Sequence, residues 1–270
     1  MKKTPFECTR ETYTIRGFEF SDGKCSSNDK KPVAIISHGF MANQKTVKKY
    51  AEFFVKQGYI AYTFDFVGGC IRGLSDGSLD KDMTLLTEIE DLKTVINYVK
   101  NNSSDYADTD RITLMGCSQG GAVSSMVAAE SDVKVEKLIL FYPALCIQDD
   151  ALKGQMIFYK FDPDNVPEKV HGFANVYLNG EYIKVAQKLN IIERAMGYKG
   201  PVLIVHGTGD NIVNYEYSVN AFESYRNSRE DSDDPDKGVF FYLIDKAKHG
   251  FKGLTDLKAK KYILDFITTK

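Results

Sequence analysis

The sequence lacks a surplus of positive charge, and this excludes two classes of partner. Its 35 basic and 37 acidic side chains leave a formal net charge of −2, so it offers no basic field to attract nucleic acid or an anionic membrane surface. It also lacks any run of the ~18 apolar residues that a membrane helix needs. We therefore expect neither nucleic acid nor a membrane among its partners.

The N-terminus lacks the features of a secretory leader. Met1-Lys2-Lys3 carries positive charge, but no apolar segment of about seven or more residues follows it. We expect a soluble protein that is cytoplasmic as the chain stands, or secreted if a leader has been removed from it.

Paired cysteines and tryptophan are also missing. The five cysteines are Cys8, Cys25, Cys70, Cys117 and Cys146, and without a Cys-x-x-Cys pair they form neither a zinc motif nor a redox motif. We expect reduced, buried thiols, and we expect no metal or cofactor, since no His, Asp or Glu cluster has metal-ligand spacing. The absence of tryptophan beside 16 tyrosines and 17 phenylalanines leaves many large rings to place.

What is present is the alternation of an α/β protein. Short apolar segments alternate with segments of helical period, which predicts a mostly parallel central sheet covered by helices on both faces. The expected strands are 12–20, 33–37, 60–64, 111–115, 137–142, 202–206 and 239–244, and the expected helices are 45–57, 84–101, 119–130, 215–226 and 255–268. We expect residues 1–270 to form a single domain.

Residues 143–200 interrupt this alternation. The segment is too long for a plain connection and contains turn signals and a hairpin-like stretch at 176–183, so it predicts an inserted lid, with a second domain as the alternative. Farther on, the charged run at 229–236 predicts a solvated surface loop.

The strongest local motif is Gly116-Cys117-Ser118-Gln119-Gly120, a G-x-S-x-G sequence between an apolar strand and a helix. Such a nucleophile elbow places the serine on a sharp turn, where glycine two residues to either side prevents collisions. An acyl-transfer serine also needs two N–H donors for the developing oxyanion. We expect these from the backbone of Gln119 and, after the strand that ends in Ser37-His38-Gly39, from that of Phe40.

The general base is one of four histidines, His38, His171, His206 and His249. The chain order serine, acid, histidine excludes His38, which we expect to hold its own loop by hydrogen bonds. His249 follows the last apolar strand, where a loop over the sheet edge would bring it to Ser118. We therefore expect His249 to be the base.

Asp210 is the expected acid, because it follows strand 202–206 by a short loop that can aim its carboxylate at an imidazole Nδ1. Asp245, four residues before His249, is the alternative. In this scheme His249 removes the Ser118 proton during attack on an ester carbonyl, Asp210 stabilises the imidazolium, and water then hydrolyses the acyl-enzyme.

These residues together resemble the α/β-hydrolase superfamily over roughly residues 33–266, and within it the feruloyl (cinnamoyl) esterases. The segments that carry the resemblance are Ser37–Phe40, Phe64–Phe66 with Ser75–Gly77, Asp82–Thr84 with Glu88–Asp91 and Asn97–Lys100, Ser118–Gly121, and Asp150–Gly154. The resemblance implies an α/β-hydrolase fold with an inserted lid and the triad Ser118, Asp210 and His249. It also implies that Asp150, in the lid, helps to bind the phenolic hydroxyl of a hydroxycinnamate.

Two features depart from those esterases. Ile157 stands where they often carry Gln, seven residues after the lid aspartate, and the loop 67–74 is longer than their short Gly-His-Gly type. Both departures affect the choice of substrate. We further expect rings in the lid to form a flat slot for a phenolic acid, with Phe158 and Tyr159 beside Ile157 as substrate contacts; the other candidate rings are Phe161, Phe173, Tyr177 and Tyr182.

The sequence therefore predicts a serine esterase for feruloyl or p-coumaroyl esters, such as those on plant cell-wall polysaccharides. Its partner would be a small-molecule or oligosaccharide ester, and a homodimer remains open. A general carboxylesterase or monoacylglycerol-type lipase is the alternative, which a lid of aliphatic residues without a partner for a phenol would favour. A hydrolase fold used only for binding is a third hypothesis, and the complete triad argues against it.

Overall fold

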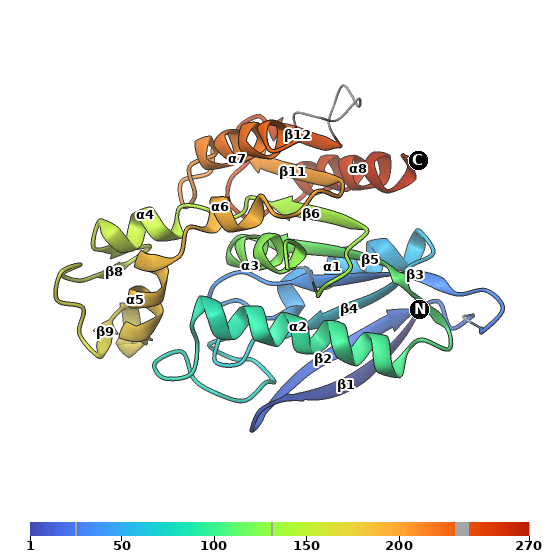
Figure 1. Ribbon diagram of the computed structural model, residues 1–270, viewed down its shortest axis with the longest axis horizontal. Coiled ribbons are helices and arrows are strands. Elements are labelled where there is room, and N and C mark those ends of the chain that lie inside the picture. Colours follow the sequence, from blue (N-terminus) through green and yellow to red (C-terminus); the bar gives the residue numbers. More distant parts are fainter. Residues whose placement is uncertain (25, 131, 230–237, 270) are drawn as a thin grey trace.

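The computed structural model describes residues 1–24, 26–130, 132–229 and 238–269, and its centre is an eight-stranded sheet with the order β1-β2-β4-β3-β5-β6-β11-β12 (Figure 1). These strands are β1 (Lys2–Arg10), β2 (Tyr13–Ser21), β3 (Lys31–Ser37), β4 (Ile60–Phe64), β5 (Ala107–Cys117), β6 (Lys137–Phe141), β11 (Val202–Gly207) and β12 (Val239–Ile244). Strand β2 pairs antiparallel with β1 and β4, and the pairs from β4 to β12 are parallel. The prediction of a mostly parallel sheet is confirmed.

Helices cover both faces of this sheet. They are α1 (Gln44–Lys56), α2 (Leu85–Asn102), α3 (Gln119–Ala128), α7 (Glu216–Asn227) and α8 (Leu254–Thr268). Alternate residues of one strand enter different cores: Val33 and Ile35 pack with α2 and α3, whereas Ala34 and Ile36 pack with α1 and α8. This two-sided burial explains why the central strands are apolar throughout.

Helix α2 illustrates how local sequence sets an element. Thr84 caps its N-terminus, and the Thr84 and Thr87 side chains each accept a hydrogen bond from the other's backbone N–H. An apolar stripe, Leu85, Ile89, Leu92, Ile96 and Val99, is buried along one face. The cap fixes where the helix starts, and the stripe fixes which side meets the sheet.

Strand β1 was not predicted from the sequence. It pairs only with β2 at the edge of the sheet, and Phe6 is its one buried residue. Its charged residues and Pro5 are typical of an edge strand, which needs little apolar sequence. A contact distant in sequence secures it, since Arg10 Nε lies 2.5 Å from Asp91 Oδ1 of α2.

The segment between β6 and β11 forms a separate layer of short elements, which Figure 1 shows projecting on the side away from the chain ends. It contains α4 (Ile147–Leu152), β7 (Gln155–Met156), β8 (Tyr159–Lys160), β9 (Lys169–His171), the 3₁₀ turn η1 (Phe173–Asn175), β10 (Tyr177–Asn179), α5 (Gly180–Lys188) and α6 (Ile191–Ala195). The hairpin predicted over 176–183 is wrong. Strand β10 pairs with the earlier strand β9, and Asn179 caps helix α5 instead of forming a hairpin turn.

The cysteines differ in their exposure. Among the described cysteines, all free, Cys117 and Cys146 are buried as expected, whereas Cys8 and Cys70 are partly exposed; Cys25 lies outside the described residues. Residues 230–236 of the charged run lie outside them as well. Within the described part of the chain, every helix is too short or too polar to cross a bilayer.

Candidate active site

Ser118 lies between two regular elements, directly after β5 and directly before α3. Its φ of 55° and ψ of −123° are a backbone conformation that non-glycine residues rarely adopt. The turn is tight enough that a Cβ added at Gly120 would lie 2.3 Å from the carbonyl oxygen of His38. The G-x-S-x-G sequence therefore forms a strained strand-to-helix turn that holds the serine at the sheet edge.

A continuous hydrogen-bonded chain leads from Ser118 to Asp210. His249 Nε2 lies 3.0 Å from Ser118 Oγ, and His249 Nδ1 lies 2.7 Å from Asp210 Oδ2. Asp210 follows β11, and His249 follows β12, so parallel strands bring the two to the same edge. The alternative acid, Asp245, is exposed and accepts a hydrogen bond from Thr208 instead.

The Asp210 carboxylate is buried and heavily hydrogen-bonded. Burial alone would raise its pKa, but hydrogen bonds from His206, His249 and the N–H groups of Val213 and Ile212 outweigh that effect and hold the pKa well below its usual range. The carboxylate therefore stays charged and can stabilise an imidazolium at His249.

Phe40 and Gln119 flank the serine from two sides. A Cβ added at Gly39 would lie 2.9 Å from the Cβ of Ser118, so the backbone that leads into Phe40 runs beside the nucleophile. Gln119 is the first residue of α3, where N–H groups have no acceptor inside the helix. Both residues line the same pocket as Ser118.

The side chain of Gln119 makes contacts that sequence reasoning missed. Its amide nitrogen donates to Glu88 Oε2 at 2.7 Å, and its amide oxygen accepts from the Tyr182 hydroxyl at 2.6 Å. All three side chains are buried. Glu88 belongs to α2 and Tyr182 to α5, so only the tertiary fold brings them to the elbow.

His38 does not join the triad but organises the loop before it. Its Nδ1 lies 2.8 Å from the carbonyl oxygen of Gly39, and its Nε2 accepts from the N–H of Phe66 and contacts the Cys70 thiol. With Asp65 and Cys70 it forms a group whose atoms lie within 4.8 Å of one another, the spacing of a metal site. Because Asp65 already accepts backbone N–H bonds, we assign the group a structural role.

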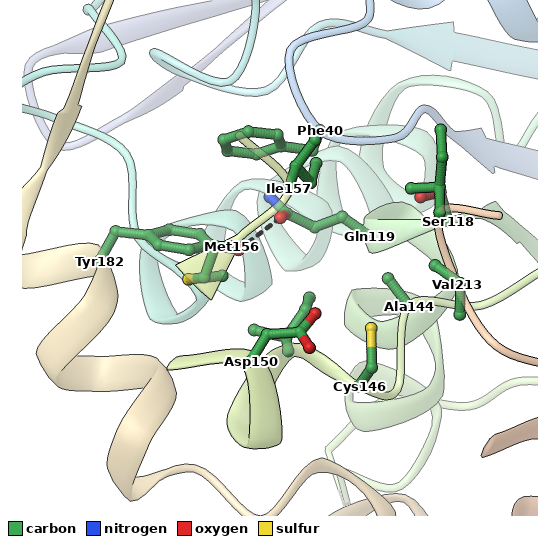
Figure 2. Close-up of a pocket in the computed structure, with 12 residues that line it drawn as sticks. Phe40, Ser118, Gln119, Ala144, Cys146, Asp150, Met156, Ile157, Tyr182 and Val213 are labelled. Carbon is green, nitrogen blue, oxygen red and sulfur yellow. Dashed lines mark hydrogen bonds between the residues drawn. The ribbon is translucent and has the colours of Figure 1, made fainter. Parts of the chain in front are cut away.

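A mostly apolar pocket opens beside Ser118, as Figure 2 shows. Its lining comprises Phe40, Ser118, Gln119, Ala144, Cys146, Ile147, Asp150, Met156, Ile157, Tyr182, Ile212 and Val213. Asp150 supplies the only carboxylate of this lining. The side chain is half-buried and forms no salt bridge within the described residues, and burial raises its pKa.

The lid rings are placed differently from the expected aromatic slot. Ile157 lines the pocket, but Phe158 and Tyr159 do not. Phe158 is 43% exposed on the surface, and Tyr159 is fully buried, with its ring 6.1 Å from that of Phe40. Of the six candidate rings only Tyr182 borders the pocket.

A second groove lies on the other side of Ser118. It is lined by Gly39, Phe40, Ala42, Thr46, Val47, Lys49, Cys117, Ser118, Tyr142, His249, Gly250, Phe251 and Lys252. Tyr142 packs edge-on against the His249 ring, with centroids 4.7 Å apart. The serine and Phe40 therefore divide two spaces, and His249 faces only the second.

The chain is similar in sequence to a known family and in structure to solved proteins. The model of the BD-FAE family matches residues 24–225. The structure of Est1E from Butyrivibrio proteoclasticus with bound ferulic acid is 26% identical, covers 98% of this chain and 100% of that chain, and has a TM-score of 0.84. A search of curated proteins finds no significant match.

Two further solved structures share the fold at lower identity. The esterase Pf2001 of Pyrococcus furiosus is 21% identical, with coverage of 98% of this chain and 91% of that chain and a TM-score of 0.72. DcsB in complex with its substrate analogue is 22% identical, with coverage of 98% of each chain and a TM-score of 0.73. With the Est1E match, these likenesses confirm the α/β-hydrolase fold.

Proposed function

Because the chain belongs to the BD-FAE family and is a carboxylic ester hydrolase, we propose that it hydrolyses esters of hydroxycinnamic acids through Ser118, His249 and Asp210. The observation that carries the proposal is the hydrogen-bonded chain of these three residues beside an apolar pocket with one carboxylate, Asp150. The likeness to Est1E, whose structure contains ferulic acid, supports the choice of acid.

The triad geometry fits acyl transfer. His249 Nε2, 3.0 Å from Ser118 Oγ, would take the serine proton as the oxygen attacks the ester carbonyl. The N–H groups of Phe40 and Gln119 would stabilise the oxyanion of the tetrahedral intermediate. His249 would then protonate the departing alcohol, and water would release the acid by the same route in reverse order.

The position of His249 suggests which of the two spaces beside Ser118 would hold the alcohol of the ester and which would hold its acyl group. The departing alkoxide must receive its proton from His249, so the alcohol occupies the groove that His249 lines. The acyl group then occupies the pocket lined by Gln119 and Asp150. We propose that residues 143–200 act as a lid over this acyl pocket, since α4, the β7 segment and α5 supply much of its lining.

Asp150 suits the phenolic end of a hydroxycinnamate. Its carboxylate borders the pocket without a salt-bridge partner in the described chain, so a ring hydroxyl is a suitable donor to it. The apolar walls would bury the ring and the propenoyl chain. Ile157 offers no polar contact to the ring, so Asp150 would bear the recognition of the phenol alone.

The test is a comparison of kcat/KM for methyl ferulate, methyl p-coumarate and p-nitrophenyl butyrate with purified protein. We expect both phenolic esters to be cleaved, and we expect ferulic acid and p-coumaric acid to act as competitive inhibitors. Cleavage of the butyrate alone would overturn the hydroxycinnamate assignment while leaving the esterase chemistry intact.

A general carboxylesterase is the second candidate, and one observation favours it. Six aliphatic or thioether side chains line the acyl pocket: Ala144, Ile147, Met156, Ile157, Ile212 and Val213. Such a lining would accept an alkyl chain without help from Asp150. A series of p-nitrophenyl esters of increasing chain length separates the candidates, because an alkyl-binding pocket would give rates that rise with chain length and exceed those of methyl ferulate.

A further inference from the structure

Tyr182, a residue of the inserted segment, contacts both residues that flank the nucleophile. Its hydroxyl donates to the Gln119 amide oxygen at 2.6 Å. Its ring lies 5.8 Å from the ring of Phe40, centroid to centroid. Figure 2 shows Tyr182 beside both side chains at the end of the pocket opposite Ser118. One side chain of α5 therefore bridges the two expected oxyanion donors.

Glu88 completes the attachment from the other side. Its Oε2 accepts from the Gln119 amide nitrogen at 2.7 Å, so both ends of the Gln119 amide are held, one by α2 and one by α5. The exposed fractions are 1% for Glu88, 2% for Gln119 and 1% for Tyr182. A buried amide that lost either partner would be left with an unsatisfied polar atom, and it would move to recover one.

We propose that Tyr182 and Glu88 are positioning residues for the oxyanion hole, so that the inserted segment supports the chemical step as well as covering the substrate. The inference rests on the proposed role of Ser118 as nucleophile, and it does not depend on which acid the enzyme prefers. Fixing the Gln119 side chain fixes the first residue of α3, and hence the direction of the N–H that meets the oxyanion.

The protonation of Glu88 is consistent with this role. Burial, opposed by the Gln119 hydrogen bond and assisted by the charge of Asp91, raises the pKa of Glu88 to about 8. The carboxyl group is therefore largely neutral near pH 7. A neutral group accepts the amide hydrogen bond without placing a negative charge behind the site where an oxyanion forms.

Loss of the Tyr182 hydroxyl should weaken stabilisation of the transition state and leave substrate binding largely unchanged. In Tyr182→Phe the ring packing against Phe40 remains and only the hydroxyl is lost. We expect kcat for p-nitrophenyl butyrate to fall about tenfold with little change in KM, less than the 10²–10³-fold loss seen when an oxyanion donor itself is removed. Affinity for phenylboronic acid, which adds reversibly to a serine oxygen and presents a tetrahedral anion, should fall by a similar factor.

Two variants of Glu88 separate positioning from packing. Glu88→Gln retains an oxygen acceptor for Gln119 and should keep near-native kcat, whereas Glu88→Leu removes the acceptor and should behave as Tyr182→Phe does. The double variant Tyr182→Phe with Glu88→Leu should lose less than the product of the single effects, because both act through Gln119. Should Glu88→Leu fail to fold, Tyr182→Phe and Glu88→Gln still decide the question.

The matched control is Tyr225→Phe, which removes another buried tyrosine hydroxyl, in α7, far from the elbow in sequence and without a hydrogen-bond partner in the described structure. It should leave kcat and boronic acid affinity unchanged. The inference is overturned if Tyr182→Phe retains native boronic acid affinity, or if that affinity and the affinity for the free product acid fall equally. Activity in Ser118→Ala would instead refute the proposed nucleophile, so the two failures are distinguishable.

Discussion

His206 and Asp210 are joined by a hydrogen bond at the same carboxylate oxygen that contacts the catalytic imidazole. His206 Nε2 lies 3.2 Å from Asp210 Oδ2, the oxygen that also contacts His249. The same Nε2 lies 3.1 Å from the carbonyl oxygen of Val213, and Nδ1 lies 2.7 Å from the Ser218 hydroxyl. With two acceptors at Nε2 and a hydroxyl donor available at Nδ1, His206 carries its proton on Nε2 and donates to Asp210.

Replacing His206 should therefore weaken catalysis through Asp210. We expect His206→Phe to lower kcat by about 10- to 100-fold, because the carboxylate loses a donor and can turn away from His249. His206→Gln, whose amide N–H can still donate, should recover part of the loss. Steady-state kinetics with thermal unfolding as a folding control would check this; equal activity of the Phe variant and the native enzyme would show that the other hydrogen bonds of Asp210, from His249, Ile212 and Val213, hold it without His206.

The triad itself gives the largest expected losses. Ser118→Ala and His249→Ala should each lower kcat by ~10⁴ to 10⁶, because the members act as a unit. Asp210→Asn should cost about 10⁴. The matched control is Asp245→Asn, which changes the exposed carboxylate four residues before His249 and should leave activity near native. A larger loss for Asp245→Asn than for Asp210→Asn would reverse the assignment of the acid.

The strands and helices of the sheet were predictable because each leaves a local signal. The apolar runs of β3 and β4 and the buried stripe of α2 can be read from a few consecutive residues. Strand β1 could not, since its formation depends on β2 and on the contact between Arg10 and Asp91. The hairpin prediction failed because Asn-Gly, at residues 179–180, serves equally well as a turn and as a helix start.

The site shows the same division between local and tertiary information. Ser118 has a sequence motif, and Asp210 and His249 follow from the order of residues after strands. The roles of Glu88 and Tyr182 follow from no catalytic motif, because they depend on hydrogen bonds to Gln119, which lies 31 and 63 positions away from them. The sequence did not reveal which aromatic side chains of the lid line the pocket for a related reason. The number of rings in a segment does not indicate which faces of its short, irregular elements turn inward.

Asp150 is the residue that should separate phenolic from alkyl substrates. We expect Asp150→Ala to raise KM for methyl ferulate several-fold and to leave p-nitrophenyl butyrate largely unaffected, since only the phenol has a hydroxyl to donate. Asp149→Ala is the control, because this neighbouring carboxylate binds the Tyr217 hydroxyl and does not line the pocket. Equal effects of Asp150→Ala on both esters would assign it a structural role.

Glu88 should make the folded state less stable as pH rises. Its pKa is about 8 in the folded protein, against an ordinary value of 4.5, so the folded state binds more protons than the unfolded state between those pH values. Stability changes with pH in proportion to the protons bound by the unfolded state minus those bound by the folded state. The contribution of Glu88 to the free energy of unfolding should therefore decline from about pH 4.5 to about pH 8 and then level off. Glu88→Gln removes this contribution, so the variant should gain stability relative to the native protein as pH rises through that window. Asp91, whose pKa burial raises to about 6, remains in both proteins, so the difference between them reports Glu88 together with its interaction with the Asp91 charge. Denaturant unfolding at pH 5, 7 and 9 would measure the difference, and a difference that is constant across the three pH values would mean that Glu88 is already ionised in the folded enzyme.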